Sequence, residues 1–154
     1  MMVVLVVPIA ALLIGVSLLL LGGGLLNTLV AVRGGLEGYS SATMGYIMSG
    51  YFMGFFLGTY LALPLVQRIG HIRAFALCAA VASSCVLLHA VLVDPVAWFV
   101  LRIVSGLVVV ILYTVIESWL NGQASGDKRG QIFAIYMVVN LSSLAAAQQL
   151  MRLD

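Results

Sequence analysis

Five long apolar stretches occupy most of the chain, and each is long enough to cross a lipid bilayer. They run over residues 4–32, 43–63, 74–93, 96–120 and 131–151, and a membrane-spanning helix needs about 20 mostly apolar residues. Charged residues make up 8% of the 154 residues, against about 25% in a typical soluble domain. The sequence therefore predicts an all-α, polytopic transmembrane helix bundle of about five spans, a single transmembrane domain over residues 1–154 with the lipid bilayer as its partner.

The distribution of basic residues favours one orientation in the membrane, because cytoplasmic connections carry an excess of Lys and Arg. One side of the predicted spans carries the basic residues Arg68, Arg73, Lys128 and Arg129. The opposite side carries Arg33 in a connection, with Arg102 and Arg152 near the ends of spans. We therefore expect the N-terminus to be cytoplasmic.

Several classes of function are excluded by what the chain lacks. Its net charge of +2, without a run of basic residues, argues against a nucleic-acid partner. No metal-ligand cluster, no nucleophile near a base and no phosphate-binding loop is present, so we expect no enzyme activity, no metal and no cofactor. Cys78 and Cys85 lie about two helical turns apart, too far to form a disulfide, and are predicted to be packing residues.

The fourth predicted span carries the clearest candidates for a functional role. At about 100° per residue, Arg102, Gly106, Tyr113 and Glu117 fall within an arc of about 60° on one helix face. Such a face is typical of a helix that lines a cavity or a protein interface. A functional interpretation makes Glu117 a proton or cation carrier and Arg102 a counter-ion or a contact for an anionic substrate. In the alternative interpretation each side chain reaches the headgroups from near a helix end or pairs with a neighbour.

The first and fifth predicted spans carry weaker polar signals. Asn27 follows three consecutive glycines, and Asn140 lies in a span that ends with two glutamines. Helices softened in this way can mark transporter binding sites, so both are candidates for the transport cavity. The alternative is helix packing supported by an interhelical hydrogen bond. His89, in the third span, is interpreted as a packed residue, with a titrating role as the alternative.

Gly50, Gly54 and Gly58 form a ridge of small residues along one face of the second predicted span. This spacing lets two helix backbones approach closely, so the ridge predicts helix packing, as does Gly106 on the fourth span. Between the second and third spans the chain is expected to form a short basic turn over residues 67–73. The connection over residues 121–130 is expected to be a polar, flexible linker.

Several short strings resemble the N-terminal half of a transporter of the major facilitator superfamily. The string Ile-Glu-Ser-Trp-Leu-Asn at residues 116–121 is similar to a string at the inner end of the fourth helix in a bacterial subgroup. Gly-His-Ile-Arg-Ala-Phe at residues 70–75 and Ala-Ile-Tyr-Met at residues 134–137 also resemble that subgroup. The resemblance implies a fold of 12 helices in two halves, of which this chain is an incomplete N-terminal half, with the missing C-terminal half as a partner.

The basic turn resembles the superfamily's loop motif between its second and third helices. Arg68, Gly70 and a displaced Arg73 are retained, whereas Gln67 stands where the motif has an aspartate. In the family that aspartate helps to lock the two halves together, so the departure puts this role in doubt. Arg102 and Gly106 match a fourth-helix motif whose arginine is linked to proton coupling in some members.

The resemblance implies a secondary active transporter, here a fragment, in a bacterial inner membrane. It would move a small-molecule substrate by alternating access, driven by an ion gradient. The alternative hypothesis is a small membrane protein without transport activity that docks on other helices through the Gly50/Gly54/Gly58 ridge.

Overall fold

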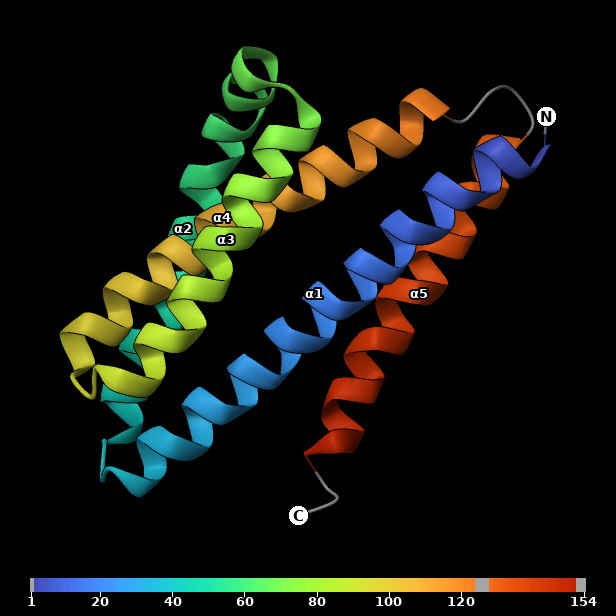
Figure 1. Cartoon of the computed structure of the whole chain (residues 1–154). Coiled ribbons are helices and arrows are strands. Elements are labelled where there is room, and N and C mark those ends of the chain that lie inside the picture. The colour runs from blue at the N-terminus through green and yellow to red at the C-terminus, as the bar shows by residue number, and fades with distance from the viewer. Residues whose placement is uncertain (1, 124–127, 152–154) are drawn as a thin grey trace. The chain divides into compact units, whose positions relative to one another are not determined.

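The computed structural model describes residues 2–123 and 128–151, and this part of the chain is almost entirely helical. The helices are α1 (Met2–Leu36), α2 (Ser41–Ile69), α3 (His71–Val91), α4 (Pro95–Gln123) and α5 (Lys128–Leu150) (Figure 1). All five described helices contain a segment long and apolar enough to cross a membrane. Helices suit this environment because their backbone groups bond within the segment, where no water is available. The predicted fold class is confirmed.

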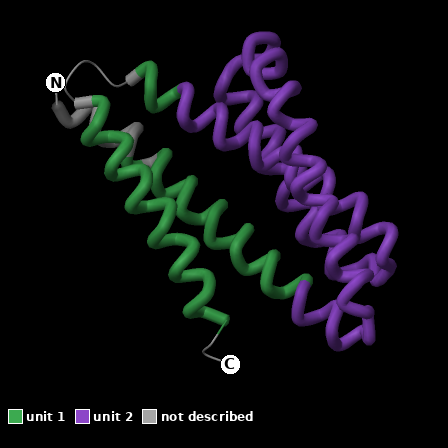
Figure 2. The backbone as a smooth tube through the Cα atoms, turned by 180° about the vertical axis from the view of Figure 1, so that it is seen from behind, with its two compact units in different colours: residues 1–30, 119–154 green, residues 31–118 purple. Residues whose placement is uncertain are grey.

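The chain divides into two compact units. Unit 1 comprises Met1–Val30 and Trp119–Asp154, and unit 2 comprises Ala31–Ser118 (Figure 2). The helices α1 and α4 contribute to both units. The single domain that the apolar pattern suggests stays a prediction.

The helices are longer than the apolar stretches, so the connections are shorter than the sequence suggests. The expected basic turn over residues 67–73 is reduced to Gly70, because α2 extends to Ile69 and α3 begins at His71. Gly70 has a φ of +83°, which only glycine adopts readily, and its N–H donates to the carbonyl of Val66 at 2.9 Å. Gln67, Arg68 and Arg73 are therefore helical residues on either side of one glycine.

The two other described connections are closed by side-chain caps. The hydroxyl of Ser40 accepts a hydrogen bond from the backbone N–H of Thr43 at 3.1 Å, at the start of α2. The carboxylate of Asp94 accepts one from the backbone N–H of Ala97 at 2.8 Å, at the start of α4. The expected linker over residues 121–130 is partly helical, since α4 includes Gln123 and α5 begins at Lys128. Its middle, residues 124–127, and Arg152 lie outside the described residues.

In unit 2, α2 and α4 pack with their backbones in close contact. A methyl group added at Gly50 would lie 2.8 Å from the carbonyl oxygen of Phe99, and one added at Gly58 would lie 2.6 Å from that of Leu107. Gly54 lies directly against the backbone of Ile103 between these two contacts. Three glycines four residues apart thus meet three α4 residues at the same spacing. More than half of the apolar segment of α4 is buried, which makes it the central helix of this unit.

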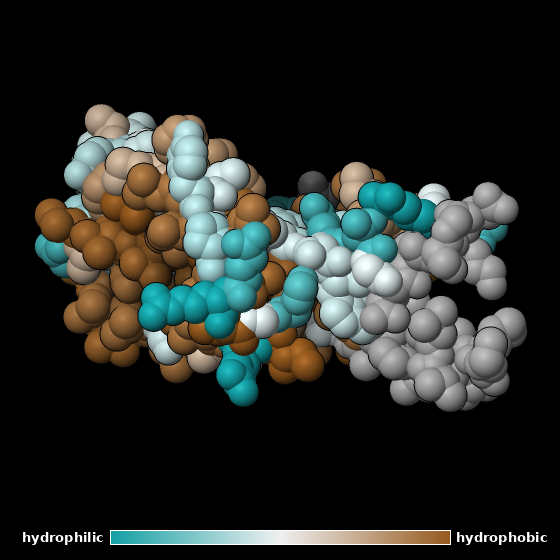
Figure 3. Space-filling model, turned by 90° about the horizontal axis from the view of Figure 1, so that it is seen from above, coloured by the Kyte–Doolittle hydropathy of each residue, from teal (hydrophilic) through white to brown (hydrophobic). Residues whose placement is uncertain are grey.

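Large hydrophobic side chains cover the outside of the helices. On α2 the aromatic residues Tyr46, Phe52, Phe56 and Tyr60 are all more than half exposed, and Figure 3 shows a broad hydrophobic area on the face in view. An exposed apolar surface of this extent is unfavourable in water. It is the surface that lipid hydrocarbon covers.

In unit 1, α1 and α5 pack side by side. A methyl group added at Gly24 on α1 would lie 2.8 Å from the Cβ atom of Ala147 on α5. The side-chain amide of Gln148 donates a hydrogen bond to the hydroxyl of Thr28 at 3.3 Å. A small-residue contact and one polar pair therefore hold these two helices.

Candidate functional site: a buried polar cluster around Arg102

Arg102 on α4 is the buried charge of unit 2, with only 1% of its surface exposed. Its Nη2 donates to the sulfur of Met48 at 3.1 Å, and its guanidinium carbon lies 5.9 Å from the centre of the Tyr51 ring. Both contacts come from α2, and the second falls within the range of a cation–π interaction. The Nε atom is buried and has no hydrogen-bond partner among the described residues. Arg102 is therefore held inside the helix packing and does not reach outward to the headgroups.

His89 on α3 is the second buried polar side chain near this point. It is 4% exposed, and its Nδ1 lies 2.7 Å from the carbonyl oxygen of Cys85. A carbonyl oxygen only accepts hydrogen bonds, so Nδ1 carries the proton of this contact. The other ring nitrogen, Nε2, is buried without a hydrogen-bond partner among the residues that the structure describes.

The pairing of α3 with α4 brings His89 and Arg102 to the same level. The side chains of Cys85 on α3 and Ser105 on α4 lie close enough to interact across the two helices. The helices α3 and α4 run antiparallel. His89 lies four residues after Cys85 on α3, and the matching position on α4 lies four residues before Ser105, next to Arg102. The His89 ring also lies 6.2 Å from that of Trp98, one turn before Arg102. His89 and Arg102 are close enough to interact electrostatically.

The other predicted residues of the α4 face lie in different surroundings. Gly106 is buried against the backbone of Tyr51 and Phe55, so at this level the face is an interface with α2. Tyr113 is half-buried and is within electrostatic range of Tyr51. Glu117 is exposed. Along this face of α4 the charged residues thus change from a buried cation, Arg102, to an exposed carboxylate, Glu117.

Asn27 and Asn140 belong to unit 1, on α1 and α5 respectively. Asn27 is exposed, and Asn140 is partly exposed. Arg102, Tyr113 and Glu117 belong to unit 2. The role of Asn27 and Asn140 in a transport cavity stays a prediction.

A polar contact that the sequence did not predict lies at the turn between α2 and α3. The Nε2 atom of His71 lies 2.9 Å from the hydroxyl of Ser118, near the other end of α4. His71 and Ser118 belong to two of the three strings that resemble one transporter subgroup. Their spacing of 47 residues carried no signal of this contact.

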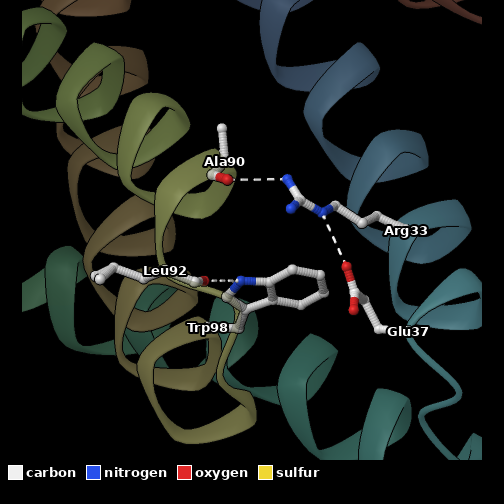
Figure 4. A network of polar contacts seen from close by, with 5 residues as sticks. All are labelled: Arg33, Glu37, Ala90, Leu92 and Trp98. Carbon is white, nitrogen blue, oxygen red and sulfur yellow. Dashed lines mark hydrogen bonds and ion pairs between the residues drawn. The ribbon is translucent and has the colours of Figure 1, made fainter.

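A second unforeseen network ties together the opposite helix ends of unit 2 (Figure 4). Arg33 donates to the carbonyl oxygen of Ala90 at 2.9 Å and forms an ion pair with Glu37 at 3.5 Å. The indole N–H of Trp98 donates to the carbonyl oxygen of Leu92. Because the last carbonyls of a helix lack intrahelical donors, the two side chains satisfy the C-terminal end of α3. Arg33, which the sequence suggested was a connecting residue, lies in the last turn of α1.

The glycine ridge of α2 is occupied within the chain itself. Gly50, Gly54 and Gly58 are all buried, and their nearest neighbours are residues of α4. The alternative hypothesis needs this ridge to be free for docking on another protein. The packing therefore does not favour it.

The fold and this site define a polytopic helical membrane protein with a cation and a histidine buried between its helices. The family described as Major Facilitator Superfamily matches residues 12–147, and the chain belongs to this family. The resemblance seen in the sequence motifs is confirmed.

Curated relatives of the chain are named as transporters of the same family. The chain is 34% identical to an uncharacterized MFS-type transporter of Enterobacter sp. (strain 638) and 33% identical to the uncharacterized MFS-type transporter YcaD of Escherichia coli O45:K1 (strain S88). Both matches extend over 133 residues, which is 86% of this chain and 35% of each relative. The chain thus spans about a third of the length of the curated relatives that it matches. No solved structure matches it at a significant level.

Proposed function

We propose that the chain forms the N-terminal part of a secondary active transporter of a bacterial inner membrane. The protein moves a small solute across the membrane by alternating access, and an ion gradient drives this movement. Its N-terminus lies in the cytoplasm. Its partner is the second, C-terminal half of the transporter. Family membership supports this proposal, together with one physical observation, the burial of Arg102 among apolar helices.

Burial of a cation inside a membrane bundle is unfavourable in free energy. Moving an arginine to the centre of a bilayer costs about 2.5–3.5 kcal/mol by insertion measurements. Arg102 is 1% exposed, and its described contacts with Met48 and Tyr51 carry no negative charge that would offset this cost. A charge retained under these conditions is typical of a substrate or ion pathway.

We assign the ion-coupling role to Glu117 and the role of counter-ion or substrate contact to Arg102. A carboxylate that binds and releases a proton gives a transporter a means of coupling solute movement to a proton gradient. Glu117 is accessible in this structure, as such an exchange requires. Tyr113, Asn27 and Asn140 are proposed as uncharged cavity residues.

The test uses the full-length protein in liposomes that contain a pH-sensitive dye. A panel of small solutes is added outside, and proton movement into the liposomes is recorded. We expect at least one solute to drive proton uptake, and we expect Glu117→Gln to abolish this uptake while the protein still inserts. Glu37→Gln is the matched control, because Glu37 is also accessible and its ion pair with Arg33 is partly exposed and worth little. Unchanged proton uptake in Glu117→Gln would remove the coupling role from this residue.

A further inference from the structure

We propose that Arg102 and His89 form a binding site for a small carboxylate, which enters together with one proton. This inference deepens the proposed function and rests on it, because it names the class of solute. It starts from two buried nitrogen atoms without partners, Nε of Arg102 and Nε2 of His89. Buried polar atoms without a hydrogen-bond partner are rare in proteins, so each one requires an explanation.

The two nitrogen atoms have opposite hydrogen-bonding needs. The Nε atom of Arg102 always carries a hydrogen and is a donor. In the neutral ring of His89, Nδ1 carries the hydrogen because it donates to the carbonyl oxygen of Cys85. Nε2 then presents a lone pair and is an acceptor. A group that satisfies both atoms must accept from Arg102 and donate to His89.

A carboxylate with one added proton meets both requirements. One carboxylate oxygen accepts the N–H of Arg102 in a charge-assisted hydrogen bond, which is stronger than a neutral one. The proton, taken from solvent, binds Nε2 of His89 and is shared with the second carboxylate oxygen. No covalent bond is broken, and the proton returns to solvent when the carboxylate leaves.

The charge balance favours this pairing. Without ligand the site holds one positive charge, on Arg102. A carboxylate and a proton add one negative and one positive charge, so the net charge of the buried site is unchanged while its cations gain a counter-ion. A carboxylate without the proton would place its oxygen against the lone pair of Nε2, which is repulsive.

The surroundings of His89 contain few other groups that titrate. Cys85 lies on the same helix, Arg102 faces it from α4, and Tyr51 lies on the α2 side of Arg102. Arg33 of α1 binds the carbonyl of Ala90, the residue after His89. Glu37, a carboxylate beside Arg33, is already paired with Arg33 at 3.5 Å. The described neighbours therefore leave the negative charge to the ligand.

The site also offers a way to observe binding. Trp98 is fully buried, and its ring centre lies 6.2 Å from that of His89. The chain has one other tryptophan, Trp119, so a Trp119→Phe variant leaves Trp98 as the fluorescent reporter of this chain.

The first experiment titrates the purified full chain in detergent with acetate at constant ionic strength, with the Trp98 signal and thermal stability as readouts. Acetamide, which has nearly the same shape without the charge, is the matched control ligand. We expect a saturable response to acetate and none to acetamide, with about one proton taken up per acetate in a weakly buffered solution. No saturable response to acetate, or equal responses to both ligands, would overturn the site.

Two variants separate the roles of the residues. Arg102→Lys keeps the charge but removes the Nε donor, and we expect acetate affinity to fall at least about tenfold. His89→Gln replaces a neutral ring by a neutral amide, and we expect it to abolish proton uptake on acetate binding. Arg73→Lys and His71→Gln are the controls, because both residues lie at the start of α3, more than four helical turns before His89, and neither should change binding. Proton uptake that persists in His89→Gln would contradict the role of His89.

Binding and transport are measured in separate experiments, so either proposal can be contradicted without the other. If some solute drives proton uptake but acetate does not bind, only the carboxylate site is contradicted. A protein that binds acetate with a proton but moves no solute in liposomes contradicts the proposed transport function alone.

Discussion

Two glycine-rich regions of the chain have similar composition but opposite packing. On α2, Gly50, Gly54 and Gly58 are four residues apart, and each lies against α4. On α1, Gly22, Gly23 and Gly24 are consecutive, and only Gly24 has a neighbour close enough to meet an added methyl group. Residues four apart share one helix face, whereas three consecutive residues point in three directions. The spacing of glycines, more than their number, therefore decides whether they form an interface.

The largest expected effect comes from breaking the α2–α4 contact at its centre. Gly54→Val puts a branched side chain into the backbone of Ile103, where no flexible side chain can move aside. We expect the free energy of unfolding to fall by at least about 3 kcal/mol. Helix content followed by circular dichroism during titration with sodium dodecyl sulfate measures this change.

Gly45→Val is the matched control on the same helix, since nothing lies within 4 Å of a methyl group added there. The control should lose less than about 1 kcal/mol, mainly from helix propensity. Equal losses for the two variants would show that helix propensity, and not the packing of α2 on α4, determines stability.

A smaller effect is expected in the α1–α5 contact. Gly24→Ala brings two methyl groups to 2.8 Å, and we expect a loss of about 1–2 kcal/mol. The contact is with the single methyl group of Ala147, so adding Ala147→Gly should restore most of the loss. Gly23→Ala, with open space around it, should change stability by less than about 0.5 kcal/mol. A double variant no more stable than Gly24→Ala would show that the strain lies elsewhere.

The smallest effect sharpens the comparison within unit 1. Gln148→Ala removes the 3.3 Å hydrogen bond to Thr28, and such interhelical bonds contribute about 0.6 kcal/mol on average in membranes. We expect a loss of that size in the same unfolding measurement, with Gln149→Ala as the adjacent control. A loss above that of Gly24→Ala would make the polar pair, and not the small-residue contact, the main link between α1 and α5.

Sequence reasoning located the helices well because the apolar stretches are long and nearly free of charge. It placed their ends poorly. The basic residues Arg68 and Arg73 suggest a loop, yet they are helical, because Gly70 alone reverses the chain. Polar residues at the ends of a membrane helix remain helical where the helix extends beyond the hydrocarbon core, so polarity marks the edge of the membrane more than the end of the helix.

The candidate site was predicted only in part. Arg102 was foreseen, since charge within a span is rare. His89 was interpreted as a packed residue, and it is packed, but its distance of 13 positions from Arg102 gave no sign that the two lie at one level. That proximity follows from the three-residue connection between α3 and α4 and from the Cys85–Ser105 contact.

The sequence by itself determined the class of protein, the number of spanning helices and the glycine ridge, because these depend on composition and on periodicity along one helix. The tertiary structure alone decided which helix the ridge meets, which charge is buried, and which polar atoms lack partners. These properties depend on how helices pair, and pairing is governed by contacts between residues far apart in the chain.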